Sequence, residues 1–175
     1  MKTVAQIKVS PSETELNGKV ISHGSISDLY REFAGDYPKF HKMDMLSKLG
    51  FMAAEILLKD FTAEEKENMA VVLFNRNGSL ITDRNYQATI SDGNFFPSPA
   101  LFVYTLANIV TGEIAIRHKI YGETSFYILS KKDETKMEEI ISSIFLTASP
   151  SFVLAGWVDY DNPEDYLAEL KLITQ

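Results

Sequence analysis

The amino-acid sequence predicts a layered α/β fold, in which a central mixed and mainly parallel sheet carries helices on both faces. Two observations predict this class. Strand-length apolar segments alternate along the chain with amphipathic helical segments, as they do in βαβ units. The run at residues 69–74 is also apolar throughout, which is typical of a strand buried on both faces.

Length and composition favour one globular domain over residues 1–175. A chain of 175 residues can bury a core of its own, and 45% hydrophobic with 23% charged residues is an ordinary composition. The formal net charge of -7 argues against nucleic acid or an anionic membrane as a partner, because both require a basic face. The N-terminal residues lack the apolar core of a signal peptide, and the longest apolar segment, residues 100–116, is interrupted by polar side chains. We therefore expect a soluble protein.

The chain contains no cysteine. This excludes a disulfide framework, a thiolate zinc site and a cysteine nucleophile. A cytoplasmic location fits that composition.

The first third of the chain predicts two strands and two helices. Residues 4–9 alternate in part between apolar and polar side chains and predict a strand, and Asn17-Gly18 marks a turn before a second strand at residues 20–21. Ser27 is the expected cap of a short helix that ends at Phe33. Residues 42–58 repeat apolar side chains every three or four positions and predict the first long helix.

The middle of the chain predicts a buried strand at residues 69–74, after a capping-box start at residues 62–65. A second long helix is expected at residues 100–118, followed by a buried strand at residues 125–129.

The last third predicts one helix and two strands. An amphipathic helix at residues 134–146 is expected to turn five side chains inward, namely Met137, Ile140, Ile141, Ile144 and Phe145. Residues 152–158 predict a strand, and residues 166–173 a further one.

The residues that commonly carry chemistry form no recognisable motif. His23, His41 and His118 are scattered and have no metal-ligand spacing, so we expect them on the surface or at its boundary. The acidic group Asp159, Asp161, Glu164 and Asp165 does not match a calcium loop and predicts a solvated loop. We expect no metal and no cofactor.

Three segments resemble the β-ketoacyl synthase family. Residues 98–117, with Asn108 followed four positions later by Gly112, look like the helix that precedes the nucleophile strand of that family. Residues 152–157 resemble the strand that ends in Ala-Gly-Gly, and residues 42–55 resemble the first core helix. The resemblance implies the N-terminal half of a thiolase-like fold.

The same resemblance implies where the nucleophile would lie. Counted from Gly122, the nucleophile position falls on Lys131, and the first glycine of Ala-Gly-Gly falls on Gly156. Where a synthase has Thr-Ala-Cys-Ala-Ser, this chain has Leu-Ser-Lys-Lys-Asp, so Ser130 and Lys132 flank the slot. A lysine there is long and hydrated, and it accepts acyl groups poorly unless it is desolvated or lies beside another cation. The resemblance therefore implies no catalytic residue in this chain.

The sequence leaves three functions open. The first is a non-catalytic ketosynthase-like subunit that serves as a binding or assembly partner in fatty-acid or polyketide biosynthesis, such as that of polyenes or pigment lipids. The resemblance implies a homodimer, or a heterodimer with a full ketosynthase, through a dimer strand made of Ser125, Phe126, Tyr127, Ile128 and Leu129. An acyl carrier protein is a further expected partner.

The other two functions differ in kind. The second is an acyl-handling enzyme of another mechanism that uses Lys131, Ser130 or His118, because Lys132 beside Lys131 is one route to a reactive amine. The third is a structural or regulatory domain without an acyl ligand.

Overall fold

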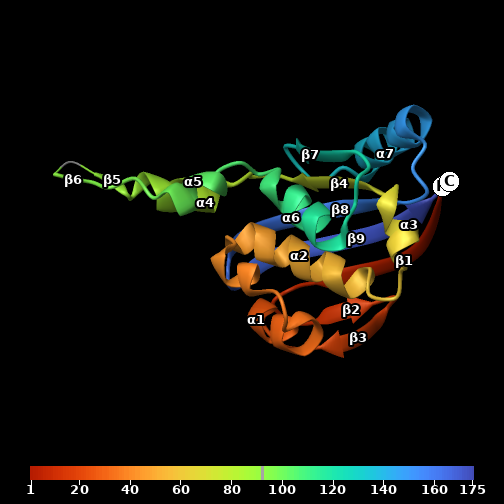
Figure 1. Ribbon diagram of the computed structural model, residues 1–175, viewed down its shortest axis with the longest axis horizontal. Coiled ribbons are helices and arrows are strands. Elements are labelled where there is room, and N and C mark those ends of the chain that lie inside the picture. The colour runs from red at the N-terminus through yellow and green to blue at the C-terminus, as the bar shows by residue number, and fades with distance from the viewer. Residues whose placement is uncertain (92) are drawn as a thin grey trace.

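A seven-stranded mixed sheet forms the centre of the molecule, with strand order β3-β2-β1-β9-β8-β4-β7. The computed structural model describes residues 1–91 and 93–175 (Figure 1). Its strands are β1 (Lys2–Val9), β2 (Thr14–Leu16), β3 (Lys19–Ser22), β4 (Ala70–Asn75), β7 (Thr124–Ile128), β8 (Val153–Asn162) and β9 (Asp165–Thr174). A separate two-stranded ribbon joins β5 (Ile90–Ser91) to β6 (Asn94–Phe95).

Helices cover both faces of the sheet, as the sequence predicted. The α-helices are α1 (Ile26–Leu29), α2 (Met45–Leu57), α3 (Ala63–Glu67), α4 (Leu80–Gln87), α5 (Pro99–Val103), α6 (Ile109–His118) and α7 (Glu134–Ala148). Helices α2 and α6 pack on one face and α7 packs on the other (Figure 1). Within the described residues, no helix has the length and apolar character that crossing a membrane demands.

The sheet contains more antiparallel pairing than we predicted. Strand β4 is parallel to both β7 and β8, but the other four pairings are antiparallel. For two of these pairings the reason is the length of the connection: β8 and β9 are joined by two residues, and so are β2 and β3. Such short connections can only reverse the chain, because parallel neighbours need a long crossover. The turn between β2 and β3 uses Asn17 and Gly18, both with positive φ, which suits a tight hairpin.

Strand β4 divides the core into two layers. All six of its residues are buried, as predicted for the run at residues 69–74. Val71 and Leu73 pack toward α2 and α6, whereas Val72 and Phe74 pack toward α7. Four of the five side chains predicted to face inward on α7 are buried on the second side, namely Met137, Ile141, Ile144 and Phe145, and the fifth, Ile140, is partly buried against them.

The first short helix begins at a different residue from the one predicted. The cap of the first short helix is Ser25 rather than Ser27, because the Ser25 hydroxyl accepts from the Asp28 N–H while the Asp28 side chain accepts from the Ser25 N–H. The following turn, Tyr30–Ala34, is a π-helix, and a 3₁₀ turn at Pro38–Lys42 leads to α2. The capping box at residues 62–65 is present at the start of α3.

The predicted long helix at residues 100–118 is instead two helices, α5 and α6, separated by a turn at residues 104–108. Hydroxyls compete with the helical backbone there: Thr105 Oγ1 donates to the Phe102 carbonyl at 2.7 Å, and Thr111 Oγ1 donates to the Asn108 carbonyl at 2.7 Å. Asn108 lies at the N-cap of α6, where its side chain makes no capping bond.

Helices α4 and α5 and the β5–β6 ribbon form a unit that projects from the body, beyond the end where β4 finishes (Figure 1). We call residues 79–91 and 93–106 the arm. The sequence pattern predicted neither α4 nor the ribbon.

Gly156 in β8 lies against the backbone of β9, and this contact yields a stability prediction. A β-carbon at this position would collide with the carbonyl oxygen of Glu169 and lie 2.9 Å from Cα of Leu170. Gly156→Ala should therefore lower the free energy of unfolding by about 3 kcal/mol, because the two strands would have to separate. Gly112 of α6 is the matched control, since nothing lies within 4 Å of its added β-carbon. Gly112→Ala should stabilise the protein by up to about 1 kcal/mol in the same urea titration, and equal effects at both sites would contradict the close packing of β8 on β9.

Candidate functional site

The carboxyl ends of the three parallel strands β4, β7 and β8 meet at one edge of the sheet, where α/β proteins commonly place their sites. A cavity of about 370 Å³ opens at this edge. Its lining comes from the ends of β4, β7 and β8 and the start of β9: Arg76, Ser130, Lys131, Lys132, Trp157, Asp159, Asp161, Asp165 and Leu167.

The turn between β7 and α7 carries the residues of the predicted nucleophile slot. Ser130 and Lys131 are exposed there, just before Asp133, which caps α7 by accepting from the Lys136 N–H at 3.1 Å. Within the described chain, Lys131 makes no ion pair. Lys131 thus lies on an exposed strand-to-helix turn at the rim of the cavity.

Lys132 is held by carboxylates from two elements. Its Nζ lies 3.0 Å from Glu134 at the start of α7 and also contacts Glu169 of β9. Burial acts to lower the pKa of Lys132, but the hydrogen bonds to Glu169 and Glu134 outweigh it, so the pKa is raised. Lys132 therefore links α7 to the sheet through ion pairs with Glu134 and Glu169.

The acidic side of the cavity belongs to the β8–β9 hairpin rather than to the solvated loop that the sequence suggested. Asp161 accepts from Asn77 Nδ2 at 3.1 Å and pairs with Arg76 at 3.4 Å. Burial raises the pKa of Asp159, although Arg76 opposes that effect. Across residues 1–91 and 93–175, no three acidic or histidine side chains converge as a metal site would need.

Strand β7 is the last strand of the sheet, and its outer edge pairs with no other strand of the described chain. The strand is half-exposed, so the prediction of a buried strand at residues 125–129 is wrong in that respect. The Val71 N–H donates to the Glu123 carbonyl and the Leu129 N–H donates to the Asn75 carbonyl. Because backbone groups alternate in direction along a strand, those of Thr124, Phe126 and Ile128 face the open edge.

The structure does not bring the three histidines together. His23 and His41 are exposed, and His41 lies edge-on against Tyr30. His118 is the last residue of α6 and precedes strand β7 in the sequence. Ser130 and Lys131 follow the last residue of β7. The three residues suggested for an acyl-handling enzyme therefore lie at opposite ends of a strand.

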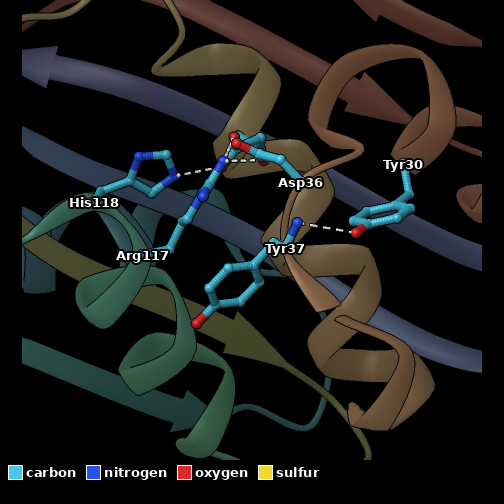
Figure 2. Close-up of polar contacts among 6 residues, drawn as sticks. Tyr30, Asp36, Tyr37, Arg117 and His118 are labelled. Atoms are coloured by element: carbon cyan, nitrogen blue, oxygen red, sulfur yellow. Dashed lines mark hydrogen bonds and ion pairs between the residues drawn. The ribbon is translucent and has the colours of Figure 1, made fainter. Parts of the chain in front are cut away.

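His118 belongs to a polar cluster that joins α6 to α2, in which His118 and Glu55 are largely buried (Figure 2). Arg117 donates two hydrogen bonds to Glu55 of α2, at 3.0 and 2.7 Å, and a third to Asp36 at 3.0 Å. These bonds raise the pKa of Arg117, above all those to Glu55. The guanidinium also lies over the ring of Tyr37, 5.1 Å from its centroid (Figure 2).

His118 is kept neutral inside this cluster. Burial removes water from the imidazole and lowers its pKa to about 4. The negative charge of Glu55, 3.3 Å away, raises the pKa by less than burial lowers it. The cluster links helix α6 to helix α2.

Comparisons with known proteins define the fold. A chain from a ketosynthase in complex with its chain length factor from Xenorhabdus doucetiae superposes with a TM-score of 0.71 at 13% identity, over 99% of this chain and 78% of that one. The chain has the ketosynthase fold. The ishigamide ketosynthase/chain length factor gives a TM-score of 0.72 at 17% identity, over 99% of this chain, which spans 61% of the length of that one.

At these identities the likeness concerns the fold, and it confirms the predicted ketosynthase-like α/β architecture. No protein-family model matches the chain. No curated protein matches it either.

Sequence reasoning missed the aspartates of β8 and Trp157 as neighbours of the turn between β7 and α7. Asp159 and Asp161 lie in a strand parallel to β4, so their contact with Arg76 and Asn77 depends on register. The sequence did contain one signal for these neighbours: Asp159 and Asp161 come directly after the apolar segment at residues 152–158.

Acid should destabilise this protein partly through His118. The unfolded chain binds a proton below about pH 6.5 whereas the folded chain resists it down to about pH 4, so stability falls as the pH drops through that window. His118→Gln should reduce the loss of unfolding free energy between pH 7 and pH 5 by about 2 kcal/mol, measured by urea titration at both values. The exposed His23 provides the control, and His23→Gln should leave the loss unchanged. A His118→Gln protein that loses as much stability as the unaltered protein would disprove the buried neutral imidazole.

Proposed function

We propose that this chain is a non-catalytic ketosynthase-like subunit that assembles with a complete ketosynthase in fatty-acid or polyketide biosynthesis. The observation that carries the proposal is the β7–α7 turn. At the position that the sequence resemblance assigns to the nucleophile, this turn has an exposed Lys131, in a chain that has no cysteine.

The chemistry of the turn supports a role without acyl transfer. An amine becomes a good nucleophile when it is desolvated or when a nearby cation lowers its pKa. Lys131 is exposed, and the charge of Lys132 is already offset by Glu134 and Glu169. Ser130 is exposed as well, and neither His23, His41 nor His118 lies beside it as a base.

The open edge of β7 supports assembly. An unpaired edge strand presents backbone donors and acceptors that another chain can complete by adding a strand. Phe126 packs inward against the core and Tyr127 stacks on Phe74, so the strand is fixed before any partner arrives. The residues Ser125, Phe126, Tyr127, Ile128 and Leu129 therefore form the dimer strand of this proposal.

The comparisons support the choice of partner. The two similar structures contain ketosynthases together with chain length factors, and this chain matches them over nearly its whole length. By analogy, the partner in this proposal is a ketosynthase that carries its own nucleophile. An acyl carrier protein would reach the complex through that ketosynthase.

The proposal is tested by mixing the purified chain with each ketosynthase of its host, produced separately. Size-exclusion chromatography with light scattering should show a one-to-one complex with one of them, and product analysis should show that the complex alters chain length or yield. If no host ketosynthase forms a complex at micromolar concentration, the proposal fails.

A charge placed on the open edge should break this complex. Ile128 is 62% exposed at the end of β7, so Ile128→Lys adds a hydrated ammonium at the interface without emptying the core. We expect the dissociation constant to rise by about tenfold or more, measured by isothermal titration calorimetry. Val20→Lys places the same charge on β3, the opposite edge of the sheet, where Val20 is 49% exposed, and should have little effect. Equal weakening by both variants would argue against β7 as the interface.

Removal of the Lys131 amine separates this proposal from the acyl-handling alternative. Lys131→Ala should leave the turnover of acyl thioesters by the complex within about twofold of the unaltered rate, because an exposed, hydrated amine takes no part in the chemistry. The measurement is release of free thiol under single-turnover and steady-state conditions. A loss of about a hundredfold, with the complex still intact, would instead identify Lys131 as a nucleophile.

A further inference from the structure

The face of the sheet beside α7 is covered only in part. The core on this side joins α7 to β4 and β8, and β9 contributes Ile173 with Leu167 at its margin. Among the described residues, no side chain of β1 belongs to that core. A cavity of about 550 Å³ lies in the uncovered region, between one face of α7 and the strands β1, β8 and β9. We call it the β1–α7 cavity, and its volume is within the range of about 300–1,000 Å³ that is typical of small-molecule sites.

Three lysines and four glutamates line this cavity, and the lysines are not equally paired. Lys132 is held by carboxylates of α7 and β9. In contrast, the Lys8 ammonium lies 3.8 Å from Glu15, which is too long for a hydrogen bond. The Lys171 ammonium lies 3.9 Å from Glu134, which is again too long. Within the described chain, these two ammoniums therefore keep hydrogen-bond donors that no protein acceptor uses.

A third donor lies beside these two lysines. Gln6 is directly opposite Lys171 in the pairing of β1 with β9, and Lys8 follows two positions later on β1. Side chains two positions apart on a strand point to the same face, so all three side chains reach the cavity together. The Gln6 backbone N–H donates to Asn17, whereas its side-chain amide makes no hydrogen bond to the described residues. The donors thus form one patch that suits an anionic group.

The other end of the cavity is apolar. Met137 and Ile141 of α7 line it, together with Ile173 of β9. The Ser142 hydroxyl contacts the Met1 sulfur at 3.6 Å, which places Met1 at this end as well. Ile141 is seven residues beyond the first residue of α7. That separation is about 10 Å along the helix axis, which is the length of an extended chain of about eight carbon atoms.

The charge of the lining selects the kind of anion. Because carboxylates outnumber ammoniums in the cavity, a doubly charged phosphate would be repelled. A single carboxylate between Lys8 and Lys171 would accept charge-assisted hydrogen bonds at little electrostatic cost. An acyl thioester carries no such charge and would leave both ammoniums without an acceptor.

We propose that the β1–α7 cavity binds a free monocarboxylic acid with a hydrocarbon chain of about eight carbon atoms. The carboxylate accepts hydrogen bonds from Lys8, Lys171 and Gln6, and the chain lies along Met137 and Ile141. The site is remote from the open edge of β7, because β8 and β4 lie between β9 and β7 in the sheet. Binding of the acid is therefore measured on the chain alone and does not depend on the proposed function.

The first test varies the ligand, with octanoate as the probe. Isothermal titration calorimetry should show one-to-one binding with a dissociation constant below about 1 mM. Butyrate keeps the charge but has a shorter chain, and it should bind at least about tenfold more weakly. Octanol and octylamine keep the chain but lack the negative charge, and each should also bind at least about tenfold more weakly.

The second test varies the two ends of the cavity. The double change Lys8→Gln with Lys171→Gln should raise the dissociation constant of octanoate at least about tenfold. Lys59→Gln alters an exposed lysine outside the cavity and should leave it unchanged. Thr3→Trp places a large side chain opposite Ile173 at the apolar end, so it should weaken octanoate and leave butyrate unchanged. Circular dichroism with a urea titration verifies that each variant folds.

Three outcomes would overturn the proposal. The first is the absence of saturable octanoate binding below about 1 mM. The second is equal affinity for octanoate and for octanol or octylamine, which would remove the role of the negative charge. The third is unchanged octanoate binding by the folded double lysine variant, which would place the acid elsewhere on the chain. If that variant does not fold, the single lysine changes and Thr3→Trp decide the question in the same way.

Discussion

Strand β4 has both faces apolar, and a strand of this kind is stable only where helices exclude water from each side. Its six residues alternate between the layer of α2 and α6 and the layer of α7, so the two layers cannot form independently of this strand. Its two neighbours, β7 and β8, are parallel to it, which brings three carboxyl ends to the same edge. The cavity, the β7–α7 turn and the base of the arm all lie where they do because β4 ends there.

Sequence patterns predicted the elements that obey a simple period and missed those that depend on distant contacts. The apolar stripe of α2 and the inward face of α7 follow from periodicity, and the strands at residues 69–74 and 152–158 follow from short apolar segments. The structure confirms all four elements. The break between α5 and α6 was invisible to the pattern, because Tyr104 is buried in the turn and its hydroxyl donates to Glu113 at 3.0 Å. An apolar run cannot reveal that one of its residues leaves the helix to reach a buried carboxylate.

The place of Lys131 in the fold was predictable from the sequence, but its surroundings were not. Spacing placed Lys131 on a turn between a strand and a helix, and the structure has that turn. The carboxylates of Glu134 and Glu169 around Lys132 could not be foreseen, since Glu169 lies on β9 and approaches only because β9 follows β8 in a tight hairpin. The half-exposure of β7 was missed for a related reason: an apolar strand in the middle of a sheet and one at its edge have similar sequences.

The pairing of β1 with β9 joins two strands that lie far apart in the sequence, with Lys2 opposite Thr174. During synthesis, the first strand emerges from the ribosome long before its neighbour exists. Residues 2–9 therefore have only the β2–β3 hairpin as a neighbour in the sheet until residues 165–174 have been translated. Contacts of such long sequence separation slow folding and leave strand edges open to wrong partners. A chaperone that shelters nascent chains would thus matter more for this protein than for one whose sheet is built in chain order.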